Sequence, residues 1–132
     1  MLKHLYFNST RLINKALIAL NFYVLPKLNF GQPFSLKIEL SSACNLKCVL
    51  CPAGENVALD RKQEFMSFDV FKKIIDQANP KTVEKILPFL WGESLIHPQF
   101  VEMMEYIKNT NNYYKVYVST HGNIDTQKID MR

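Results

Sequence analysis

Three cysteines, Cys44, Cys48 and Cys51, lie within eight residues in the spacing C-x3-C-x2-C. Thiolates are the protein ligands of iron–sulfur cubanes, and so short a loop can wrap three of them around three corners of a 4Fe-4S cluster. The fourth iron would then be open to a substrate or cofactor. A structural zinc would instead need a fourth protein ligand, such as His97 or His121, and zinc sites usually come as spaced CxxC pairs. The spacing therefore favours the open cluster.

The cysteine count also bears on the redox compartment. An odd number of cysteines cannot form a closed disulfide framework. We therefore expect the three thiols to be metal ligands in a reducing compartment and the protein to be cytoplasmic.

Three segments that must position this chemistry are predicted to be strands, because apolar and polar residues alternate strictly in them or because they are rich in β-branched and aromatic residues. They are residues 34–40, about 83–90, and 114–119. The first runs into the cysteine loop. The second, whose far end Pro88 makes irregular, runs into the segment 91–93, and the third runs into the segment 120–122.

Helical patterns separate these strands. Ser67 is placed to cap a helix with an apolar face, which Asn79-Pro80 then ends. Pro98 suits the first position of a second helix. Its predicted inward face comprises Val101, Met104 and Ile107, flanked by Phe100 and Met103.

The order βαβαβ predicts a parallel sheet with right-handed crossovers, hence an α/β fold. In such sheets ligands gather at the carboxyl ends of the strands. The cysteine loop and the segments 91–93 and 120–122 all follow strands directly. We therefore expect all three to meet at one edge of the sheet.

Residues 1–32 form a basic, amphipathic helical segment. The first thirty residues carry four cations and no acid, so the net charge of +4 lies entirely there. The helix's apolar residues are expected to pack on the body of the protein: Leu12, Ile13, Ala16, Leu17 and Leu20. The alternative is a basic amphipathic membrane anchor. The longest unbroken apolar run, residues 16–20, is too short for a transmembrane segment.

The composition indicates one globular domain, since 48% of the 132 residues are hydrophobic and 21% are charged. Outside the first thirty residues the charges balance, which argues against nucleic acid as a partner.

From residue 34 to residue 123 the sequence resembles the radical S-adenosylmethionine (radical SAM) enzymes, most closely those with a SPASM-type C-terminal extension. The resemblance implies a 4Fe-4S cluster on Cys44, Cys48 and Cys51 whose open iron binds the amino and carboxylate groups of S-adenosylmethionine. It also implies the activity, which is one-electron cleavage of that cofactor to methionine and a 5′-deoxyadenosyl radical.

Two further segments carry the resemblance. The residues from Gly92 to Pro98 are similar to the family's Gly-Gly-Glu-Pro-Leu segment, which implies that Gly92 and Glu93 hold the methionine amino group. An alternative is that Glu93 is a solvated loop acid. Ser119-Thr120-His121-Gly122 is similar to the family's Thr-Asn-Gly turn, with His121 in place of the asparagine, and this assigns Thr120 to the same cofactor site.

The family fold is a partial (βα)6 barrel, and this chain matches only its N-terminal half, three βα-type strands preceded by a helix. We therefore expect three regions: the N-terminal segment 1–32, a truncated radical SAM core at 33–124, and a polar tail at 125–132. The expected partners are S-adenosylmethionine, an electron donor, a peptide or protein substrate, and a chain that supplies the missing strands.

Two other functions stay open from the sequence, and the chain alone is not identified as a complete enzyme. One is a stand-alone iron–sulfur or electron-transfer module. The other is a structural zinc protein.

Overall fold

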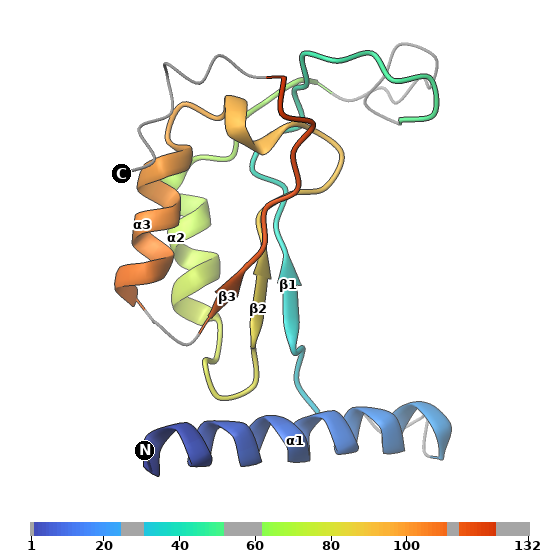
Figure 1. Ribbon diagram of the computed structural model, residues 1–132, viewed down its shortest axis with the longest axis vertical. Helices are drawn as coiled ribbons and strands as arrows, with labels where there is room; N and C mark the ends of the chain where they lie inside the picture. The colour runs from blue at the N-terminus through green and yellow to red at the C-terminus, as the bar shows by residue number, and fades with distance from the viewer. Residues whose placement is uncertain (1, 25–30, 52–61, 111–113, 124–132) are drawn as a thin grey trace.

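The structure is a computed structural model that describes residues 2–24, 31–51, 62–110 and 114–123. Its elements, shown in Figure 1, run in the order α1 (Leu2–Tyr23), β1 (Ser35–Lys37), α2 (Phe68–Gln77), β2 (Lys85–Leu87), the 3-10 helix η1 (Ser94–Ile96), α3 (Phe100–Thr110) and β3 (Lys115–Val116). The predicted tail at 125–132 lies outside the described residues.

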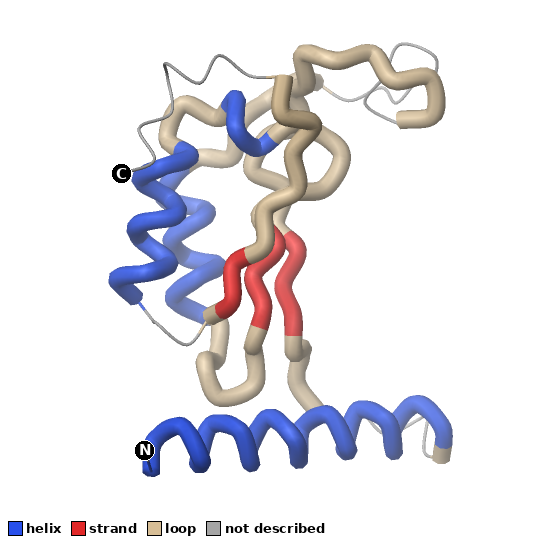
Figure 2. Tube along the Cα trace, in the orientation of Figure 1, coloured by secondary structure: helices blue, strands red, loops and turns tan. Residues whose placement is uncertain are grey.

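The three strands form one parallel sheet, as the βαβαβ pattern predicts, and their order in the sheet is β1-β2-β3. In its register Leu36 pairs with Ile86, and Ile86 pairs with Val116. Figure 2 shows how short the regular strands are, compared with the predicted ranges. Regular pairing in β2 ends at residue 87. The next residue, Pro88, has no N–H to donate to the ladder.

Helices α2 and α3 lie side by side on one face of the sheet (Figure 1). Ser67 caps α2 as predicted, because its hydroxyl accepts a hydrogen bond from Val70 N at 3.4 Å. The core between the helices and the sheet is apolar and comprises Ile38, Leu40, Phe71, Ile75, Val83, Ile86, Phe100, Met103, Ile107 and Tyr114.

The predicted inward face of α3 is rotated. The structure buries Phe100, Met103 and Ile107, whereas Val101 and Met104 are half-buried at the margin of the core. Residues 100, 103 and 107 form an apolar strip next to the predicted one. Because both strips are apolar, the sequence pattern does not by itself distinguish them, and the strip with the bulkier Phe100 faces inward.

Helix α1 crosses beneath the amino ends of the strands, at the far end of the molecule from the cysteine loop (Figure 1). It docks through polar side chains. Arg11 Nη2 donates to Val83 O at 3.3 Å, and Asn14 exchanges two 2.8 Å hydrogen bonds with the backbone of Gln32. The amino ends of the strands and the turns beside them present backbone carbonyls that need donors.

The expectation that the apolar face of α1 packs on the body is therefore wrong. The five residues of that face are all exposed: Leu12, Ile13, Ala16, Leu17 and Leu20. Leu12, for example, is 70% exposed. Among the described residues, no helix is long and apolar enough to cross a membrane.

Glu84 ties α1 to the sheet electrostatically. Its carboxylate lies 2.9 Å from Lys15 Nζ on α1 and 2.9 Å from Lys115 Nζ on β3. The Glu84 side chain is only 12% exposed. Hydrogen bonds from Lys15 and then Lys115 lower the pKa of Glu84 from 4.5 to about 2.

We predict that this carboxylate makes folding stability depend on acid pH. A folded-state pKa below the unfolded value adds stability that is complete above pH 4.5 and lost as the pH falls towards 2. Because both lysines are substantially exposed, we expect a contribution of about 1 kcal/mol. Urea unfolding between pH 6 and pH 2.5 measures it. Parallel pH profiles for the unaltered chain and E84Q would contradict it.

Candidate functional site

The cysteine loop leaves the carboxyl end of β1 in a defined turn. Ser41 is buried; its hydroxyl donates to Ala43 O at 3.0 Å and accepts from Ala43 N at 3.1 Å. Beyond the turn Cys44 is half-buried, and Leu46 N donates to its Sγ at 3.4 Å. Hydrogen bonds of this kind are a means by which proteins tune sulfur ligands.

All three thiols are free. Cys51 is half-buried, Cys48 is exposed, and a turn joins them, since Cys51 N donates to Cys48 O at 3.1 Å. Within the described ranges no three Cys, His, Asp or Glu side chains converge to hold one metal ion. A cubane binds its cysteines at separate corners, so the thiols need not converge on one point. Three free thiols on one accessible loop fit such a cluster.

Both histidines proposed as a fourth zinc ligand are engaged elsewhere. His97 is buried; its Nε2 lies 2.8 Å from Met66 O, and its Nδ1 accepts from Gln99 N at 3.0 Å. Its place at the start of α3 is therefore structural. His121 contacts Glu93 rather than a cysteine.

The turn at 91–93 packs directly on the root of the cysteine loop. Glu93 N donates to Ala43 O at 2.9 Å, and Cys51 Sγ lies 3.8 Å from Trp91 O. Gly92 is required for this approach, because an added Cβ would overlap Ser41 O and lie 2.7 Å from Ala43 O. A glycine is therefore required at position 92, because the backbones of the two segments are in contact there.

Glu93 is buried, at 3% exposure, so its interpretation as a solvated loop acid is wrong. Its Oε1 accepts from Leu95 N at 3.0 Å and caps η1. Its Oε2 accepts from Thr120 Oγ1 and from His121 N, both at 3.1 Å, and lies 3.2 Å from His121 Nε2. The structure therefore brings Gly92, Glu93 and Thr120 together, as expected for segments that follow adjacent parallel strands.

Sequence reasoning missed two residues that complete this arrangement. Asn45, between the first two cysteines, donates through Nδ2 to Asn123 O at 2.8 Å and so joins the cysteine loop to the turn after β3. His121 was interpreted only as a turn residue or a zinc ligand. The sequence carries no signal for this contact, because the donor to His121 Nδ1 is the backbone N–H of Asn123, a group that every residue except proline has.

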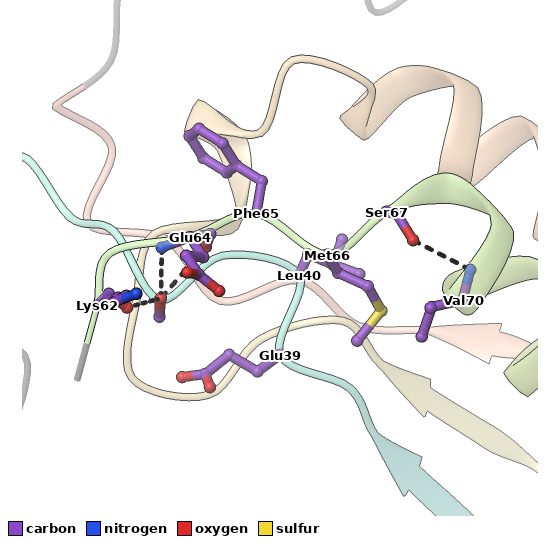
Figure 3. Close-up of a pocket in the computed structure, with 9 residues that line it drawn as sticks. Glu39, Leu40, Lys62, Glu64, Phe65, Met66, Ser67 and Val70 are labelled. Carbon is purple, nitrogen blue, oxygen red and sulfur yellow. Dashed lines mark hydrogen bonds between the residues drawn. The ribbon is translucent and has the colours of Figure 1, made fainter.

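A separate hollow of about 490 Å³ lies between the end of β1 and the start of α2 (Figure 3). Ser42 bridges its wall, accepting from Glu64 N at 2.8 Å and donating to Lys62 O at 3.0 Å. Glu39 also lines it, but accepts from Trp91 N at 3.2 Å. Neither Glu93 nor a cysteine lines this hollow, so it is distinct from the candidate site.

Several curated proteins are similar to this chain. A GTP 3′,8-cyclase of Desulforamulus reducens is 29% identical over 87 residues, which are 66% of this chain and 26% of the cyclase. The tungsten-containing aldehyde ferredoxin oxidoreductase cofactor-modifying protein of Pyrococcus furiosus is 30% identical over 95 residues, 71% of this chain and 25% of that protein. The chain thus spans about a quarter of the length of these relatives. No family model matches it.

Among solved structures, BtrN in complex with AdoMet and 2-DOIA is similar, with a TM-score of 0.64 and 19% identity. The match covers 74% of this chain and 39% of BtrN. These relatives and BtrN are radical SAM enzymes. At this identity the structural likeness shows the fold, which is α/β and matches part of a radical SAM barrel.

We predict that G92A destabilises the protein by about 2–4 kcal/mol, because the new methyl group must separate the turn at 91–93 from the cysteine loop. G122A is the matched control. Gly122 has φ 72° but nothing within 4 Å of an added Cβ, so only backbone strain of about 1 kcal/mol is expected there. Thermal unfolding measures both, and equal losses would contradict the steric explanation.

Proposed function

We propose that this chain is the N-terminal part of a radical SAM enzyme, with a 4Fe-4S cluster on Cys44, Cys48 and Cys51 and S-adenosylmethionine bound beside Glu93. The observation that carries the proposal is the junction of the cysteine loop with a buried carboxylate, made by the 2.9 Å hydrogen bond from Glu93 N to Ala43 O. The relatives support it at the level of the enzyme class. When bound, the cluster and cofactor supply one-electron cleavage of the sulfonium, and with it a radical able to abstract hydrogen.

The chain's own residues would bind and orient the cofactor. Glu93 is a buried carboxylate and so a strong acceptor for an ammonium group. Gly92 lets the backbone of its turn approach the cysteine loop without a side chain between them. Thr120 holds one oxygen of Glu93 by its hydroxyl. We assign Gly92, Glu93 and Thr120 to the cofactor on this basis.

The finer proposals concern what completes the site. The edge of β3 is open in the described structure, where Val116, Tyr117 and Val118 are 39%, 49% and 41% exposed. Further strands, from the same polypeptide or from a partner chain, would pair with this edge and cover those side chains. We propose residues 33–124 as the core that they extend, with 1–32 as a separate helical segment.

The reaction partners are proposals of the same kind. An electron donor must reduce the cluster, and the exposed Cys48 side of the loop is accessible to one. A peptide or protein substrate, and membership of the SPASM subgroup, rest on the sequence resemblance.

We predict that the full chain, reconstituted anaerobically with iron and sulfide, binds about four irons and gives a cubane EPR signal when reduced. C44A, C48A and C51A should each lose most of that signal, because three corners need three thiolates. S67A, which removes the cap of α2, is a control that should keep it. Retention of the full signal by all three cysteine variants would contradict the assignment.

We also predict that S-adenosylmethionine changes this EPR signal. The E93Q variant should keep the cluster but bind the cofactor about tenfold or more weakly. An amide has lost the charge that strengthens a hydrogen bond with an ammonium, typically a difference of about 1–3 kcal/mol. Titration of the signal with cofactor measures this. A signal that ignores the cofactor in the unaltered chain would favour an electron-transfer module, and stoichiometric zinc without iron a structural zinc protein.

A further inference from the structure

Helix α1 presents an apolar face on the side away from the rest of the molecule. Its buried polar residues, Arg11 and Asn14, contact the amino ends of the strands and the segment before β1. At 3.6 residues per turn, the opposite side of the helix, within about 50°, holds positions 12, 13, 16, 20 and 23. The residues there are all exposed: Leu12, Ile13, Ala16, Leu20 and Tyr23. In Figure 1 every other described element lies on one side of α1.

The charge behind this helix is positive. Arg11 and Lys15 of α1 and Lys115 of β3 lie around one carboxylate, Glu84. These side chains carry three positive charges and one negative charge, a net +2. Lys81 is exposed in the adjoining turn, and the first thirty residues contain no acid. A helix is about 10 Å across, which is about the Debye length at 0.1 M salt, so this potential reaches the outward face.

The other end of the molecule has the opposite balance. The carboxyl ends of the strands and the first turns of α2 and α3 lie there (Figure 1). Among the described residues of that end, carboxylates outnumber ammonium groups: Glu39, Glu64, Asp69, Glu93 and Glu102 against Lys47 and Lys62. The charge is thus distributed along the long axis, with the positive end at α1. A negatively charged surface would attract the molecule with α1 foremost.

We infer that α1 is an interfacial helix that binds the surface of a membrane containing anionic lipid. Helices of this kind lie in the plane of the interface, with the apolar face buried about 5–10 Å among the headgroups and acyl chains. The 22 residues of α1 give it a length of about 33 Å for such contact. Phe22 and Tyr23 at its end have aromatic rings, which are favoured at the headgroup level. This inference does not depend on the cluster or the cofactor.

Two other occupants of the apolar face fit the structure less well. A second copy of the chain, paired about a twofold axis, would bring two groups of the same positive charge together. Further strands added beside β3 would extend the sheet in its own plane, and so would lie on the polar side of α1 (Figure 1). An anionic lipid surface complements both the apolar face and the charge behind it.

Binding through α1 would also orient the candidate functional site. The cysteine loop and the turn at 91–93 lie at the end of the molecule away from α1 (Figure 1). The exposed Cys48 would therefore face the aqueous phase, where a water-soluble partner can reach it.

The first experiment measures vesicle binding. The full chain is mixed with vesicles of phosphatidylcholine alone or with about one third phosphatidylserine, and bound protein is separated by flotation. We expect binding to the anionic vesicles to be about tenfold tighter than to the neutral ones, because several cations lie near the surface. Raising the salt concentration from about 0.1 M to about 0.5 M should remove most of this difference.

Two double variants test which surface binds. L12Q/I13Q removes two side chains of the apolar face that are 70% and 61% exposed, and should weaken binding about tenfold or more. V49Q/L50Q is the matched control, because Val49 and Leu50 are also exposed neighbours but lie in the cysteine loop. It should bind within about twofold of the unaltered chain. Glutamine is about as good a helix former as leucine, so L12Q/I13Q should keep its unfolding midpoint.

A second experiment tests the orientation on the vesicle. The chain has one tryptophan, Trp91, at the end away from α1. Lipid brominated in its acyl chains quenches tryptophan that enters the membrane. We expect no quenching of Trp91 in the unaltered chain, whereas the added indole of Y23W should be quenched and its emission shifted to shorter wavelength.

Each contrary result overturns the inference. An unaltered chain that does not float with anionic vesicles, or floats equally with neutral ones, has no anionic membrane as its partner. Equal losses in L12Q/I13Q and V49Q/L50Q, or quenching of Trp91, would place the contact on another surface. A dimer in solution that L12Q/I13Q dissociates, without vesicle binding, would show that a second copy covers the face. None of these results bears on the EPR tests of the proposed function.

Discussion

The carboxyl edge of this structure depends on the burial of Glu93. Removing a carboxylate from water costs several kcal/mol unless hydrogen bonds replace its hydration. Here the replacement comes from two segments, Leu95 N in η1 and the donors of Thr120 and His121 after β3. These segments must stay where they are for the charge to be tolerated. The same carboxylate that is proposed to bind a ligand therefore also holds the loops of the site together.

The amino edge follows the same physical rule. There the groups in need of partners are backbone carbonyls and Glu84, and α1 supplies Arg11, Asn14 and Lys15. This requirement explains why the helix turns its polar side inward. The apolar face predicted to pack was assigned by hydropathy alone, whereas the surface it meets at the ends of the strands is polar.

The sequence predicted the parallel sheet and the edge at which the three segments meet because both follow from patterns that are local. The alternation at 34–40 and the polar segments after each strand place Cys44, Glu93 and Thr120 together without any long-range information. The face of α3 could not be predicted in the same way, since two apolar strips compete and only packing against α2 and the sheet decides. The side-chain contacts of His121 were equally out of reach, because they depend on the rotamer of a side chain and on the position of Asn123.

The contact between Asn45 and Asn123 gives this arrangement its last constraint. The turn at 120–123 holds Glu93 by its first two residues and the cysteine loop by its last, at 2.8 Å from Asn45 Nδ2. The backbone at Gly92 packs on Ser41 and Ala43 and so holds the cysteine loop from the other side. A displacement of the turn after β3 would therefore move the carboxylate and the loop that carries the thiols together. The spacing between the proposed cluster and the proposed ligand-binding carboxylate is thus a property of one connected set of backbone contacts, rather than of two sites that happen to be adjacent.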